Sequence, residues 1–139
     1  MLKLRGIVTG ASRGIGAAIA IELDRRGYEV YGLSRSGRSS AGTGIVCDMT
    51  DEGVVRDTFG RITDDGPVNV LVNNAGFHVS ARSSSLSVAD YTAVMALNAT
   101  AVMVACRETY PPMKGGGGGM IVNIGSFFDK LGVPGNLAY

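Results

Sequence analysis

A glycine-rich turn near the start of the sequence has the residue types and spacing of an anion site. Residues 9–16 read Thr-Gly-Ala-Ser-Arg-Gly-Ile-Gly, so that the glycines are Gly10, Gly14 and Gly16. Because glycine has no Cβ, a backbone of this composition turns tightly and approaches a pyrophosphate closely. A helix that begins here would add unpaired N–H groups and the positive end of its dipole. The pattern favours a diphosphate site over an ordinary glycine turn.

The elements that must position this turn are a strand before it and a helix after it. Residues 4–9 form a short run with β-branched side chains that ends in glycine, which predicts a buried strand. Residues 15–26 have helical periodicity, and Gly27 is placed to end that helix. The apolar face of the predicted helix consists of Ile15, Ala18, Ile19, Ile21 and Leu23.

Strands and helices alternate along the rest of the sequence. The predicted helices are residues 51–62, with Asp51 at the start, and residues 88–110, which Pro111 and Pro112 would end. The second of these is apolar on more than one side, so one face is expected to meet another subunit. The next three predicted strands, each suited to burial on both sheet faces, are residues 28–33, 45–47 and 68–72. The fifth predicted strand is residues 120–124.

This alternation predicts an α/β protein with a doubly wound parallel sheet of five strands, covered by helices on both faces. Residues 1–139 are long enough for one domain with a real core. In such sheets, ligands bind at the carboxyl ends of the strands near the point where the strand order reverses. The glycine-rich turn is therefore expected at that edge, while residues 115–119 form a plain glycine-rich linker at the other edge.

Composition excludes several classes of protein. Hydrophobic residues make up 45% and charged residues 18%, with a formal net charge of +1, which argues against disorder and against broad nucleic-acid binding. Cys47 and Cys106 have neither the number nor the spacing of a disulfide framework or a metal site. No signal-peptide region fits, and the apolar run at residues 101–106 is shorter than the roughly 18 residues that span a membrane. We expect a cytoplasmic protein without metal.

The spacing of the glycine turn differs from the common G-x-G-x-x-G pattern, and it resembles that of the short-chain dehydrogenase/reductase family. The family pattern Thr-Gly-xxx-Gly-x-Gly is matched from Thr9 to Gly16. The similarity continues to the last residue through Asp48, Asn73-Asn74-Ala75-Gly76, Asn98, Ser126 and Tyr139. It implies a Rossmann-type, nucleotide-binding fold that covers the whole chain.

The residues after the second predicted strand favour NADP(H) over NAD(H). An NAD site usually has an acidic side chain there, which accepts hydrogen bonds from the ribose 2′-hydroxyl. Here Ser34 takes that place, Arg35 follows it, and Arg13 lies in the glycine turn. Two guanidinium groups could bind a 2′-phosphate, and the resemblance implies the same preference.

The resemblance implies further cofactor contacts after the third and fourth strands. Asp48 matches a family aspartate that receives a hydrogen bond from the adenine, although capping a turn is an equally simple role for it. The expected cofactor-binding set is Gly10, Ser12, Arg13, Gly14, Ile15, Gly16, Ser34, Arg35, Asp48, Met49, Asn74, Ala75 and Gly76.

The resemblance also implies the reaction, which is hydride transfer between a nicotinamide and a small-molecule carbonyl or alcohol. Tyr139 would protonate the substrate oxygen and Ser126 would hold it. Asn98 would interrupt its helix and position a water molecule of the proton relay. Such acid catalysis is typically worth about 10² to 10⁴ in rate.

The sequence ends at Tyr139, before the lysine that follows this tyrosine in the family. We therefore expect a single NADP-binding domain that is incomplete at its C-terminus, with the last strands missing and the fifth strand exposed as an edge. Such a chain would bind NADP(H) weakly and turn over little. The alternative is a non-catalytic nucleotide-binding or oligomer-forming module, and either protein could be a homo-oligomer.

Overall fold

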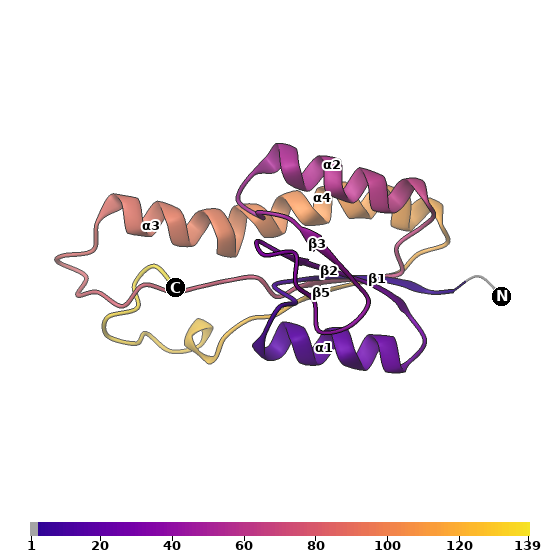
Figure 1. The fold of residues 1–139 in the computed structure, drawn as a ribbon. Coiled ribbons are helices and arrows are strands. Elements are labelled where there is room, and N and C mark those ends of the chain that lie inside the picture. Colours follow the sequence, from indigo (N-terminus) through magenta and orange to yellow (C-terminus); the bar gives the residue numbers. More distant parts are fainter. Residues whose placement is uncertain (1–2) are drawn as a thin grey trace.

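The computed structural model describes residues 3–139 as one parallel sheet with helices on both faces (Figure 1). The strand order is β3-β2-β1-β4-β5, and every neighbouring pair is parallel. The strands are β1 (Arg5–Thr9), β2 (Glu29–Ser34), β3 (Thr43–Val46), β4 (Val70–Asn73) and β5 (Met120–Asn123). This architecture confirms the predicted Rossmann-type α/β fold, and the strand order reverses between β1 and β4.

Helix α1 covers one face of the sheet, and α2 and α4 cover the other (Figure 1). Helix α2 begins as predicted, because the side chain of Asp51 accepts a hydrogen bond from the Val54 amide at 3.0 Å. The helices are α1 (Gly14–Arg25), α2 (Glu52–Asp64), α3 (Val88–Met95), the π turn η1 (Ala96–Thr100), α4 (Ala101–Gly115) and the 3₁₀ turn η2 (Phe127–Asp129).

Two hydrophobic cores lie on the two faces of the sheet. Successive side chains of a strand point to opposite faces, so Ile7 joins the core under α2 and α4, while Val8 joins the core under α1. Both side chains are completely buried. Burial of each such side chain is worth about 1.5–3 kcal/mol, so the two layers fix the sheet between its helices.

The predicted apolar face of α1 is partly wrong. Ile15 and Ile21 are 62% and 50% exposed, and the buried residues of α1 are Gly16 and Ala20. The reason is close packing: a Cβ at Gly16 would collide with the carbonyl oxygen of Gly10, so small residues rather than large ones face the sheet. Ile19 and Leu23 fill the remaining space at the edges of this contact.

Burial of the third strand on both faces is also wrong. Strand β3 is an edge strand that pairs only with β2, and three of its four residues are exposed, including Val46 at 66%. The expected exposure of the fifth strand is confirmed in this structure, where β5 forms the other edge and Met120 is 60% exposed.

The last long helix continues through the two prolines that were expected to end it. Pro111 and Pro112 lie inside α4, which extends to Gly115. Proline has a helical φ, so the chain can continue as a helix, but each proline lacks the N–H that would bond to the carbonyl four residues earlier, at Arg107 and Glu108. The chain leaves the helix two residues after Gly115, at Gly117, whose φ of +99° allows the Gly118 amide to donate to the Met113 carbonyl at 2.9 Å.

The helical stretch Val88–Gly115 has 28 residues and contains an 18-residue segment with a mean hydropathy of 1.4, which by length and composition alone would suffice to cross a membrane. The inner face of this stretch is part of the protein core. Val94 is buried, and Val104 and Met113 pack in the core under α2 and α4. Contact with the sheet and with α2 thus explains the buried part of this stretch, but only 22% of its apolar 18-residue segment is buried.

Candidate nucleotide site and active site

The predicted site residues gather at the carboxyl edge of the sheet, because all five strands point the same way. The glycine turn follows β1, Arg35 follows β2, Asp48 follows β3, Asn74 follows β4, and Ser126 follows β5. Helix α3 and the chain segments near the C-terminus extend past this edge (Figure 1). The structure therefore places the predicted residues on one side of the molecule.

The glycine turn adopts a backbone conformation that requires glycine. Gly10 and Gly14 have φ values of +67° and +59°. A Cβ at Gly10 would also lie 2.9 Å from Nδ2 of Asn74 and 3.0 Å from Cα of Ala75. The turn lies on the end of β2, since the Gly10 amide donates to the Leu33 carbonyl at 2.8 Å. The resulting loop leads directly into the N-terminus of α1, where unpaired N–H groups are available for phosphate oxygens.

The segment after β4 is hydrogen-bonded to the glycine turn. The hydroxyl oxygen of Thr9 accepts hydrogen bonds from the Asn74 and Ala75 amides, each at 3.0 Å. In return, Nδ2 of Asn74 donates to the carbonyls of Thr9 and Gly10 at 3.1 and 3.3 Å. These bonds join the two loops at the point where the strand order reverses.

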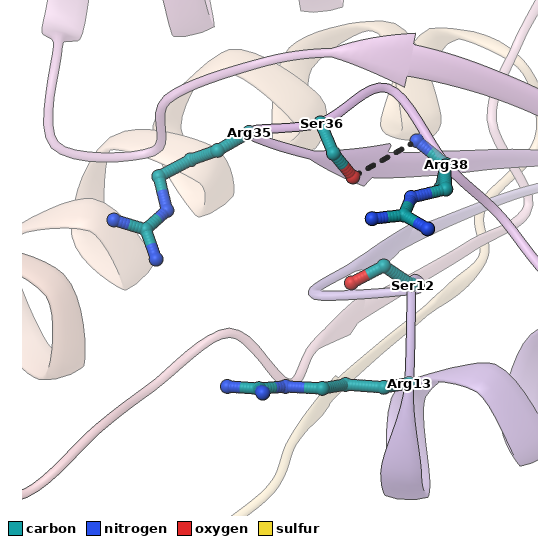
Figure 2. A pocket seen from close by; sticks show the side chains of 5 residues that line it. All are labelled: Ser12, Arg13, Arg35, Ser36 and Arg38. Atoms are coloured by element: carbon teal, nitrogen blue, oxygen red, sulfur yellow. Dashed lines mark hydrogen bonds between the residues drawn. The ribbon is translucent and has the colours of Figure 1, made fainter.

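A basic pocket of about 460 Å³ lies beside the glycine turn. It is lined by Ser12, Arg13, Arg35, Ser36 and Arg38, and Figure 2 shows Ser12 between the side chains of Arg38 and Arg13. None of the described acidic side chains lines it. The structure thus brings together Arg13 and Arg35, as the sequence predicts, and adds a third guanidinium group that the sequence analysis missed.

The loop after β2 explains the place of Arg38. The buried hydroxyl of Ser34 donates to the Arg38 carbonyl at 2.8 Å, and the Arg38 amide donates to the Ser36 hydroxyl at 3.3 Å. Gly37, with φ of +71°, allows the chain to fold back over these bonds. Ser34 therefore shapes the pocket, and a glycine two residues after Arg35 was the sequence signal for a turn that returns a further basic residue to the site.

Asp48 and Met49 occupy different environments. One carboxylate oxygen of Asp48 accepts hydrogen bonds from the Thr50 amide at 2.9 Å and the Thr50 hydroxyl at 2.7 Å. These two bonds, amide first, and the charge of Arg35 lower the pKa of Asp48. Met49 is buried in the core beside Cys47, so only its backbone could contact a ligand. Capping of the turn, the simpler role considered for Asp48, is therefore present in the structure.

Asn98 does interrupt its helix. It lies in the π turn η1 between α3 and α4. Its Nδ2 donates to the Phe77 carbonyl at 2.8 Å, and its Oδ1 accepts from the Phe77 amide at 3.0 Å. The side chain of Asn98 is thus paired with the backbone that follows the Asn-Asn-Ala-Gly segment.

The other two predicted catalytic residues lie in the chain after β5. Ser126 is partly buried, and its hydroxyl oxygen accepts a hydrogen bond from the Phe128 amide at 3.2 Å. Tyr139 is 45% exposed, and its ring contacts the rings of His78 and Phe128. The sequence analysis gave no role to His78 or Phe128.

The sequence similarity agrees with this geometry. A model of the short chain dehydrogenases matches residues 6–139, so the chain belongs to the short-chain dehydrogenase/reductase family. Proteins of this family are oxidoreductases that act on small molecules with nicotinamide cofactors. The family and the fold therefore confirm the class of protein that the glycine turn suggested.

Individual relatives cover most of this chain. Gluconate 5-dehydrogenase of Gluconobacter oxydans is 37% identical over 97% of this chain and 58% of its own length. D-threitol dehydrogenase of Mycolicibacterium smegmatis is 30% identical over 96% of this chain and 56% of its own length. A metagenomic short-chain oxidoreductase in complex with NADP has a TM-score of 0.89 and 30% identity, covering 98% of this chain and 68% of that one. The chain thus spans a little over half the length of the curated relatives.

Proposed function

We propose that this protein is an NADP(H)-dependent oxidoreductase that transfers a hydride between the nicotinamide and a carbonyl or alcohol carbon. The observation that carries the proposal is the basic pocket at residues 12, 13, 35, 36 and 38. Three guanidinium groups beside two serine hydroxyls match the charge and the hydrogen-bonding capacity of a 2′-phosphate. The metagenomic neighbour in complex with NADP supports the same choice of cofactor.

The residues at the carboxyl edge fit such a cofactor. Neighbouring atoms lie where a Cβ of Gly10 or Gly16 would be, so the turn is compact and the pyrophosphate can approach the N-terminus of α1. Arg13, Arg35 and Arg38 would hold the 2′-phosphate. Asp48 would face the adenine with the carboxylate oxygen that Thr50 does not occupy. Backbone groups of the Asn74-Ala75-Gly76 segment would line the cleft beside the glycine turn.

The chemistry is assigned to three residues. When bound, the nicotinamide supplies or accepts the hydride. In the reductive direction, the phenol of Tyr139 donates its proton to the substrate oxygen, and the hydroxyl of Ser126 donates a hydrogen bond to the same oxygen. Both polar groups of the Asn98 side chain are paired with Phe77, so a relay water would bind to backbone groups freed by the π turn.

The test is a titration of the chain with NADPH and NADH, followed by cofactor fluorescence. Arg35→Ala and Arg38→Ala should each weaken NADPH binding by about 10-fold or more, because each removes a charged hydrogen bond worth roughly 1.5–3 kcal/mol. NADH binding should change little. Arg56→Ala is a matched control, since Arg56 is exposed on α2 and pairs only with its neighbour Asp57 at 3.5 Å.

Two results would count against the proposal. Equal affinity of the folded wild-type chain for NADPH and NADH would remove the assigned cofactor preference. Equal loss of affinity in Arg56→Ala and Arg38→Ala would mean that general charge, and not the pocket, attracts the nucleotide. Circular dichroism of each variant shows whether the chain is folded.

Self-association and a cytoplasmic location stay predictions. The outer side of the Val88–Gly115 stretch carries exposed Tyr91, Met103 and Tyr110, at 45%, 53% and 57%. This is the surface on which a second copy of the chain would be expected to bind. Sedimentation velocity of the wild type and of Met103→Lys measures whether it does.

A further inference from the structure

The ring of Tyr139 lies against two aromatic rings from distant parts of the chain. The ring centroids of His78 and Tyr139 are 5.5 Å apart with an interplanar angle of 59°. Those of Phe128 and Tyr139 are 6.0 Å apart, with the rings nearly perpendicular at 86°. Both separations fall within the roughly 4.5–7 Å range of attractive aromatic pairs. His78 follows β4 and Phe128 follows β5, so the two contacts join Tyr139 to two loops at the carboxyl edge of the sheet.

The position of His78 is itself fixed by the backbone. Asn98 binds both the amide and the carbonyl of Phe77, the residue immediately before His78. A few residues later, the Ala81 amide donates to the Gly135 carbonyl at 2.9 Å, and Ala81 forms a parallel bridge with Asn136. The segment that carries His78 is thus bonded to the π turn at one end and to the segment that precedes Tyr139 at the other.

We propose that His78 is a positioning residue for Tyr139, and that Asn98 sets its place through Phe77. This inference rests on the role of Tyr139 as the proton donor in the proposed function. A tyrosine that is 45% exposed can adopt several side-chain rotamers, and catalysis requires the hydroxyl to stay near one position. The imidazole contacts the ring of Tyr139, so it acts on the orientation of the phenol. Phe128 makes the second ring contact with Tyr139.

The sequence offers a direct probe, because His78 is the only histidine. Its Cε1 proton therefore gives a single, unambiguous imidazole resonance in a proton–carbon NMR spectrum of the chain. We expect the ring current of Tyr139 to displace this resonance from its random-coil position. Tyr139→Leu should return it toward that position, and Tyr139→Phe should leave it displaced. A wild-type resonance at the random-coil position would overturn the contact.

The positioning itself is tested by observing Tyr139 while His78 is changed. The chain is labelled with ¹³C-tyrosine, and the signals that disappear in Tyr139→Phe are assigned to Tyr139. His78→Ala should move these signals toward their random-coil positions, and His78→Phe should preserve their dispersion because it keeps an aromatic ring. Tyr139 signals that do not change in His78→Ala would overturn the proposal. The dispersion of the other tyrosine signals reports whether each variant is folded.

The same samples separate this inference from the proposed function. The basic pocket contains neither His78 nor Tyr139, so NADPH affinity should be the same in His78→Ala as in the wild type. Unchanged Tyr139 signals together with a clear NADPH preference would remove the positioning role alone. If the wild-type chain binds NADPH no better than NADH, the proposed function is contradicted. The contact between His78 and Tyr139 can still be tested by NMR in that case.

Discussion

The side chain of Asn98 pairs with both backbone groups of Phe77, donating to the carbonyl at 2.8 Å and accepting from the amide at 3.0 Å. A side-chain amide has the same donor and acceptor as a peptide unit, so it can replace a strand neighbour. The π turn brings this amide out of the regular helical repeat and toward the segment after β4. A residue that resemblance assigns to a proton relay is therefore also the anchor of the chain that carries His78.

Asn98→Ala should release this segment. Two hydrogen bonds are lost at a partly exposed site, so we expect a cost of about 1–2 kcal/mol in the free energy of unfolding. The sharper measurement is hydrogen exchange of the Phe77 amide, which should lose its protection in Asn98→Ala. Asn98→Asp should keep part of that protection, because a carboxylate oxygen still accepts from the amide. Equal exchange in the wild type and Asn98→Ala would show that the pairing does not form in solution.

Gly10 should tolerate no side chain. Its φ of +67° is costly for other residues, and a Cβ would lie 2.9 Å from Nδ2 of Asn74. Gly10→Ala should therefore lower the free energy of unfolding by more than about 2 kcal/mol and abolish nucleotide binding. Gly60→Ala is the matched control, because Gly60 lies within α2 with open space where a Cβ would be. It should raise stability by about 0.5–1 kcal/mol in urea denaturation. A similar loss in both variants would contradict this account.

The sequence predicted the order and type of the major elements because strand and helix periods are local properties. It could not predict which side of α1 faces the sheet. Ile15 and Ile21 are apolar yet exposed, since the close contact is made by Gly16 and Ala20. Hydrophobicity favours burial of large side chains, whereas the short distance between a helix and its sheet can favour small ones.

The sequence predicted those parts of the site whose backbone is specified by a motif. It predicted less well the residues that only tertiary contacts bring to the site. The loops that carry Gly10 and Asn74 meet as expected. Arg38 lines the site because Gly37 turns the chain back; the glycine indicates a turn there, but residue types alone do not specify where the turn places Arg38. His78 meets Tyr139 across 61 positions of the chain through two loops of irregular structure, for which no periodic signal exists.

Arg5 is a buried cation that should be costly to remove. It is 6% exposed and donates to the Ile62 and Gly66 carbonyls at 2.8 and 2.6 Å and to the Tyr31 hydroxyl at 2.6 Å. Its Nε donates to Glu29 at 3.0 Å. Arg5→Met fills similar space but leaves these acceptors without donors, so we expect a loss of about 3 kcal/mol in urea denaturation.

The partners of Arg5 provide graded controls. Glu29→Gln should cost less than about 1 kcal/mol, because the Glu29 side chain is 46% exposed and water can replace the ion pair. Tyr31→Phe removes only the hydroxyl that accepts from Arg5. Its loss in the free energy of unfolding should lie between those of Glu29→Gln and Arg5→Met. If Arg5→Met were no more destabilising than Glu29→Gln, the carbonyl contacts would contribute nothing.

Thr50 should control the pKa of Asp48. The Thr50 amide and hydroxyl donate to the same carboxylate oxygen, and they hold the pKa of Asp48 below its ordinary value. Because the folded-state pKa lies below the unfolded value of about 3.9, these bonds stabilise the fold above that pH. Their contribution is lost as the pH falls through the folded-state pKa. Thr50→Val removes the hydroxyl but keeps the amide. The pKa of Asp48, measured by carboxyl NMR titration, should therefore rise part of the way toward its ordinary value. Acid unfolding should then begin at a higher pH. Thr50→Ser keeps both donors and should behave as the wild type. An unchanged pKa of Asp48 in Thr50→Val would contradict the role of the hydroxyl and leave the Thr50 amide and the charge of Arg35 as the causes.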